Sequence, residues 1–170
     1  QVLHIRLWVE CGNPGANKLL VGLDTSEGAM RAVDHVVSTR NGFNERQIFL
    51  MHAVRTWRGM SPIPTPLMAQ IEEERINALI AEATESIEPV FKEATQRLER
   101  GGYKPDRIRT EVISGVESRA MAMIQYAREN EIGTLIMGRR GLSRAEDFIM
   151  GRVGHNIVNT VRNRAVWIVV

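Results

Sequence analysis

Glycines and arginines between residues 138 and 153 have the types and spacing of a phosphate-binding loop. Gly138-Arg139-Arg140-Gly141 is followed, after nine residues, by Gly151-Arg152-Val153. Glycine lets backbone N–H groups approach an anion closely, and the first turn of a helix presents unpaired donors with partial positive charge. A strand that ends at Gly138 and a helix that opens at Gly151 would therefore hold a phosphate between them.

This spacing differs from the better-known phosphate loops. The segment has no Gly-Lys-Ser/Thr, so it is not a Walker A loop, and it does not match G-x-G-x-x-G. Six arginines and only two carboxylates lie between Gly138 and Arg164, which predicts a local positive field. Alternatively, the side chains of Arg139, Arg140 and Arg144 lie on a solvated face of the loop. The spacing alone does not decide between this interpretation and contact with a phosphate.

Other polar side chains offer little catalytic chemistry. His52 lies within an apolar run, which is typical of a core histidine, and His155 is expected on a helix surface. The four histidines and the single cysteine show no metal-ligand spacing. Ser114, Ser118 and Ser143 lie in no nucleophile motif. We therefore expect a binding protein and not an enzyme, with slow ATP hydrolysis as the upper limit of any activity.

Short apolar runs alternate with helical patterns along most of the chain. The runs predict five buried strands, at residues 18–23, 47–54, 107–114, 133–138 and 165–170. Four helices are expected between them, at residues 26–40, 66–100, 116–130 and 151–163. Ser26 is expected to cap the first helix, and Pro89 is expected to kink or split the second.

This alternation indicates an α/β protein with a doubly wound parallel sheet, helices on both faces and hence three layers. Ligands in such folds bind outside the carboxyl ends of the strands, where the strand order reverses. Asp24, Val54 and the pair Met137-Gly138 follow or end predicted strands, so they are the first candidates. The alternative role for Asp24 is to cap the following helix.

The segment from Leu135 to Val153 resembles the signature of the universal stress protein family, whose nucleotide-binding members carry Gly, two residues, Gly, nine residues, Gly and then Ser or Thr. Leu19 to Gly28 (LLVGLDTSEG) resembles the opening motif of that family, and Met51 to Val54 resembles its second strand. The resemblance extends over residues 17–170. It implies five parallel strands in the order 3-2-1-4-5.

The resemblance also implies a role for each matching residue. Asp24 would contact the adenosine moiety, Val54 would line the adenine pocket, and Met137 and Gly138 would approach ribose and adenine. The phosphates would lie beside the remaining motif residues, which are Arg140, Gly141, Gly151, Arg152 and Val153. The implied ligand is ATP, or AMP or ADP, with Mg²⁺ arriving on the phosphates. The loop would contact phosphate and not the base, so guanine nucleotides, cyclic nucleotides and dinucleotides remain alternative ligands.

Arg152 departs from the family pattern, because it occupies the position of the expected Ser or Thr. Its guanidinium could pair with a phosphate through several donors, or it could fill the site and exclude a triphosphate. Two hypotheses follow. The chain is a nucleotide-binding regulatory domain of the stress response, or it is a nucleotide-independent dimerisation and signalling module with a closed phosphate site.

The last strand, Ala165 to Val170, supports the second hypothesis. In a monomer it would form an exposed apolar edge, and exposed edges pair with other strands. Its expected partner is the same strand of a second chain, or the strand-like residues 2–7. We interpret residues 1–16 as a strand and linker, with residues 1–8 as the tail of a preceding copy, and residues 17–170 as one domain. An arbitrary chain boundary is the alternative.

Composition excludes several classes of protein. The chain has 170 residues and a net charge of +2, which is too small to argue for nucleic acid by itself. No apolar run approaches the ~20 residues that span a bilayer. A single cysteine, Cys11, is consistent with a reducing compartment, so we expect a cytoplasmic protein.

Overall fold

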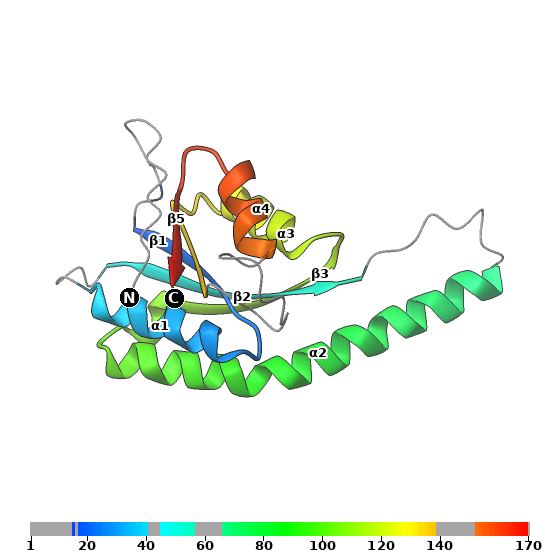
Figure 1. Ribbon diagram of the computed structural model, residues 1–170. Coiled ribbons are helices and arrows are strands. Elements are labelled where there is room, and N and C mark those ends of the chain that lie inside the picture. Colours follow the sequence, from blue (N-terminus) through cyan, green and yellow to red (C-terminus); the bar gives the residue numbers. More distant parts are fainter. Residues whose placement is uncertain (1–14, 16, 41–44, 57–65, 139–151, 170) are drawn as a thin grey trace.

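The computed structural model describes residue 15 and residues 17–40, 45–56, 66–138 and 152–169. These residues form one parallel sheet of five strands in the order β3-β2-β1-β4-β5, with four α-helices packed against it (Figure 1). The predicted α/β class and the strand order 3-2-1-4-5 are confirmed. Helices α1 and α2 cover one face of the sheet, and α3 and α4 cover the other, so the molecule has three layers.

The strands bury both of their faces, as parallel strands between two helical layers must. Leu19 and Val21 of the first strand pack against α1 and α2, whereas Leu20 between them packs against α3 and α4. Each strand agrees with its predicted range to within two residues at either end. The strands are β1 Lys18–Gly22, β2 Gln47–Arg55, β3 Ile108–Val116, β4 Thr134–Gly138 and β5 Ala165–Val169.

The helices are α1 Glu27–Ser38, α2 Pro66–Arg100, α3 Arg119–Glu129 and α4 Arg152–Thr160, with a short 3-10 turn, η1, at Pro105–Arg107. Helix α3 begins three residues later than residue 116, where the sequence predicted its start. The reason is that β3 continues to Val116, and the Ser118 hydroxyl then caps the helix by accepting a hydrogen bond from the Met121 N–H at 3.5 Å.

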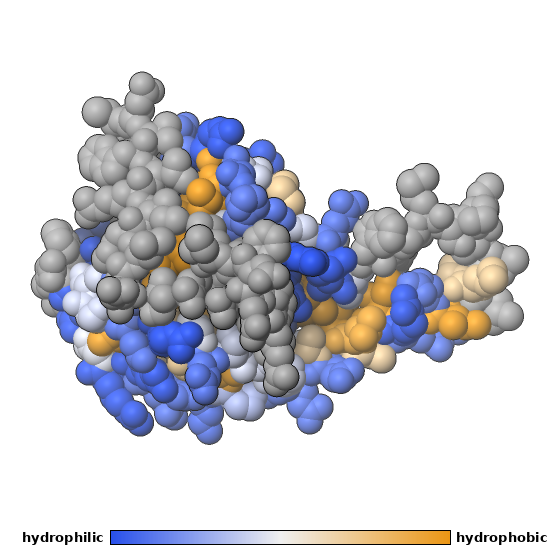
Figure 2. Space-filling model, viewed as in Figure 1, coloured by the Kyte–Doolittle hydropathy of each residue, from blue (hydrophilic) through white to orange (hydrophobic). Residues whose placement is uncertain are grey.

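Of the two outcomes expected at Pro89, a kink or a split, the split does not occur: helix α2 is continuous, and Figure 1 shows it bending along its length. Its C-terminal half is anchored on the core by Ile87, Phe91, Ala94 and Leu98. Packing on both sides of Pro89 therefore holds the helix together despite one lost hydrogen bond. The N-terminal half projects past the sheet and carries hydrophobic residues on its surface (Figures 1 and 2).

Strand β5 lies at one edge of the sheet and pairs only with β4 among the described strands. Ile168 is only 2% exposed and packs in the core beneath α4. The open edge of a strand is its backbone, whereas its side chains point into the two layers.

Residues 1–14, which hold the predicted preceding strand, lie outside the described residues. No described helix is long and apolar enough to cross a membrane.

Candidate functional site

A cavity of about 480 Å³ opens at the carboxyl ends of the strands. Strands β1 and β4 are neighbours with Gly22 opposite Met137, and their following helices, α1 and α4, cover opposite faces of the sheet. The strand order reverses between them, which is where ligands bind in open α/β sheets. The cavity is lined by Gly22, Leu23, Asp24, Ser26, Ala29, Met51, His52, Ala53, Arg55, Glu117, Ser118, Arg119, Ala120, Met123, Met137, Gly138, Arg152, Val153, Gly154 and Asn156.

Asp24 shapes the turn from β1 into α1 and faces the cavity. Its Oδ1 atom accepts a hydrogen bond from the Ser26 N–H at 3.0 Å and another from the Ser26 hydroxyl. Ser26 occupies the position before the helix, as predicted, but its side chain makes no capping bond, and its hydroxyl donates to Asp24. The Oδ2 atom of Asp24 takes part in no hydrogen bond among the described residues.

Met137 and Gly138 form the opposite wall. Met137 is 5% exposed and ends the buried part of β4. A Cβ atom at Gly138 would lie 2.6 Å from the carbonyl carbon of Gly28, so β4 and the start of α1 touch here without room for a side chain. Gly138 therefore serves close packing as well as bordering the cavity.

At the end of β2 the wall is formed by His52, Ala53 and Arg55. The pairing of β2 with β3 shifts register between Ala53 and Arg55, and such a bulge re-aims the side chains that follow it. The described atoms that line the cavity do not include Val54, which is 8% exposed, so its contact with a base stays a prediction. The ring of His52 is held by its Nδ1 atom, 2.9 Å from the Leu23 carbonyl oxygen.

The first turn of helix α4 lines the cavity. Arg152 is its first residue, and Val153, Gly154 and Asn156 also line the cavity. The Arg152 side chain is exposed and makes no hydrogen bond or ion pair with any described residue. The predicted phosphate-site residues Arg140, Gly141 and Gly151 lie outside the described residues.

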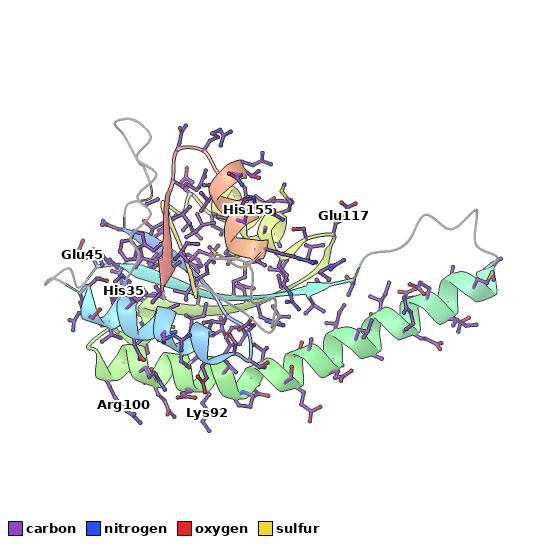
Figure 3. All side chains as sticks on the ribbon, in the orientation of Figure 1. His35, Glu45, Lys92, Arg100, Glu117 and His155 are labelled. Atoms are coloured by element: carbon purple, nitrogen blue, oxygen red, sulfur yellow. The ribbon has the colours of Figure 1, made fainter. Side chains whose placement is uncertain are left out.

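Sequence reasoning missed the contribution of α3. Glu117, Ser118 and Arg119 lie at the turn from β3 into this helix and line the cavity. Figure 3 labels Glu117 at this turn. The available signal was a serine cap followed by an arginine, directly after a predicted strand. It was overlooked because β3 was expected to be two residues shorter, which placed this turn inside the helix.

Comparison with known proteins decides the family. The profile of the universal stress protein family matches residues 15–169. The chain belongs to the universal stress protein family. A search of curated protein sequences found no match.

Solved structures share the universal stress protein fold at low identity. A protein whose structure served to assign its biochemical function is 22% identical, with a TM-score of 0.70 over 89% of this chain and 94% of that one. Universal stress protein UspA from Lactobacillus plantarum is 18% identical, with a TM-score of 0.64 over 90% of this chain and 97% of that one. A universal stress protein solved in complex with cAMP is 22% identical, with a TM-score of 0.60 over 90% of this chain and 96% of that one.

The described part of this universal stress protein holds no group of three or more His, Cys, Asp or Glu side chains that could bind a metal ion. His155 projects from α4, and its Nε2 atom lies 3.0 Å from Asn159 Nδ2 (Figure 3). The described residues of the site present two carboxylates, several guanidinium groups and an apolar wall. This arrangement can bind a ligand that has hydroxyl groups, an apolar face and an anionic end.

Proposed function

We propose that this universal stress protein is a nucleotide-binding regulatory domain that takes an adenine nucleotide of the ATP type at the cavity between β1 and β4. The observation that carries the proposal is the convergence of five predicted site residues on one cavity of about 480 Å³, namely Asp24, Met137, Gly138, Arg152 and Val153. The volume lies within the range of small-ligand sites. Two solved relatives, one of them from Archaeoglobus fulgidus, are complexes with cAMP and dAMP.

Each wall of the cavity suits one part of a nucleotide. Oδ2 of Asp24 can accept hydrogen bonds from ribose hydroxyls while Oδ1 stays with Ser26. Met51, Ala53 and Met137 provide an apolar surface for the flat base, since methionine adapts its shape to what it contacts. Arg152, at the positive end of α4, is placed to pair with phosphate oxygens.

We propose regulation without conventional catalysis. Among the described residues, no hydrogen bond joins Ser26 or Ser118 of the cavity to His52, and the His52 ring already contacts a backbone carbonyl. We propose that binding in the cytoplasm changes the surface around the cavity, and that Mg²⁺ enters with the phosphates.

The test is calorimetric titration of the nucleotide-stripped chain with ATP and Mg²⁺, after mass spectrometry for a nucleotide that co-purifies. Asp24→Asn keeps an acceptor for Ser26 and removes the charge, so it should weaken binding without changing the melting temperature. Asp106→Asn, on the exposed turn η1, is the matched control. Binding to none of ATP, ADP or AMP would refute the proposal.

The alternative is a nucleotide-independent dimerisation module. It is favoured by the edge position of β5 and by Arg152, which lines the cavity and could close it. Light scattering, together with the titration, distinguishes the nucleotide-binding domain from the dimerisation module. A dimer that forms without nucleotide, in a chain that binds none, supports this alternative, whereas a monomer that binds ATP rules it out.

A further inference from the structure

Two neighbouring helices begin with an arginine at the same cavity. Arg119 is the first residue of α3 and Arg152 is the first residue of α4, and both line the cavity. The two helices pack against each other on one face of the sheet (Figure 1). Since both follow parallel strands, both start at the carboxyl edge of the sheet.

The two side chains can reach one ligand. Packed helices have axes about 8–10 Å apart, so two long side chains that start at neighbouring helix ends can meet an anion from opposite sides. The positive ends of both helix dipoles add to the field at this point. A third guanidinium, that of Arg55 at the end of β2, lines the same cavity.

These arginines differ from the surface arginines that carboxylates hold. Arg97 and Arg75 are each held by carboxylates. Arg119 and Arg152 make no hydrogen bond or ion pair with any described residue. Two carboxylates, Asp24 and Glu117, are among the described lining residues, and neither forms an ion pair with Arg119 or Arg152.

We propose that Arg119 and Arg152 form a clamp for a polyphosphate, so that the cavity selects nucleotides by the number of their phosphate charges. This inference rests on the proposed function and deepens it, because it names the ligand class as nucleoside di- and triphosphates. Arg119 then supplies the binding energy that the missing Ser or Thr at position 152 would have provided. A hydrogen bond between two charged groups outweighs one from a neutral hydroxyl.

The experiment compares the nucleotide-stripped wild-type chain with Arg119→Gln and Arg152→Gln. The control is Arg128→Gln, a second exposed arginine of α3 that does not line the cavity. Calorimetry measures the affinities for adenosine, AMP, ATP and inorganic tripolyphosphate. Arg119→Gln should weaken ATP and tripolyphosphate by about 10- to 100-fold and leave adenosine unchanged, while the control stays at the wild-type value.

The clamp also predicts that the two substitutions are coupled. If both guanidiniums hold one polyphosphate, the double variant should lose less ATP affinity than the product of the two single losses. The wild-type affinity for ATP should fall with added salt more steeply than the affinity for AMP. Equal loss of adenosine and ATP in Arg119→Gln would indicate a merely structural role and overturn the clamp.

The outcomes separate the two proposals. Nucleotide binding that is insensitive to Arg119→Gln overturns the clamp and leaves the proposed function standing. Binding of tripolyphosphate but of no nucleotide overturns the proposed function and supports a polyphosphate site. Binding of neither overturns both.

Discussion

Gly138, the last residue of β4, lies so close to the start of α1 that an added methyl group must move the backbone. A Cβ atom there would be 2.6 Å from the Gly28 carbonyl carbon and 3.0 Å from the Gly28 Cα, and nearest of all to the Gly28 oxygen. Carbon atoms in good contact are about 3.5 Å apart, so β4 and α1 must separate by roughly 0.9 Å. Backbone atoms cannot rotate away as a side chain can.

We expect Gly138→Ala to lower the free energy of unfolding by about 2–3 kcal/mol, which is the upper part of the range for overpacking. For a domain of this size that corresponds to a melting temperature lower by about 4–12 °C. Gly22→Ala is the matched control, since Gly22 ends the neighbouring strand and lines the same cavity. Its added Cβ would meet the flexible end of Met123 at 2.8 Å, and alanine also suits a strand better than glycine. We expect its effect to stay within about 1 kcal/mol.

Urea unfolding of the two variants, followed by circular dichroism, measures the difference. The midpoint should fall for Gly138→Ala with an unchanged slope, because the native contacts change and the exposed area does not. Equal midpoints for Gly138→Ala and Gly22→Ala would refute the reasoning. If the midpoint falls only for Gly138→Ala, any loss of ligand binding in this variant combines a packing effect on the site with a steric effect on the ligand.

Three further predictions concern the rest of the fold. Arg97→Gln removes hydrogen bonds of 2.9 and 2.7 Å to Asp34 that join α2 to α1; since both side chains are partly exposed, urea unfolding should show a loss of about 0.5–1 kcal/mol that shrinks at high salt. Burial, assisted by Glu111, raises the pKa of Tyr126, so its contribution to stability is present below about pH 10 and is lost as the pH rises through the folded pKa. Thermal melts from pH 8 to 11 should therefore fall less steeply for Tyr126→Phe than for the wild type. Ile168→Lys places a charge in the core, and circular dichroism should show a loss of about 3 kcal/mol or an unfolded chain.

The order of elements and five of the residues that line the cavity could be predicted from local patterns. Strand and helix periodicity depends on near neighbours in the chain, so β1, β2 and β4 were predicted almost to the residue. The motif likewise placed Asp24, Met137 and Gly138 at strand ends, and the sheet order then brought them together.

Two features needed the folded molecule. The bulge between Ala53 and Arg55 depends on pairing with β3, so no local pattern could show that Arg55 and not Val54 lines the cavity. The burial of Ile168 depends on α4 lying over β5.

By itself, the sequence determined the α/β class, the family and the strand ends where a ligand would lie, because these follow from hydrophobic periodicity and from short motifs. Only the tertiary structure decided that Arg119 faces the same cavity as Arg152, and that Gly138 presses on Gly28. Contacts between residues so far apart in the chain arise from how whole helices pack on the sheet, and that packing is a property of all the elements together.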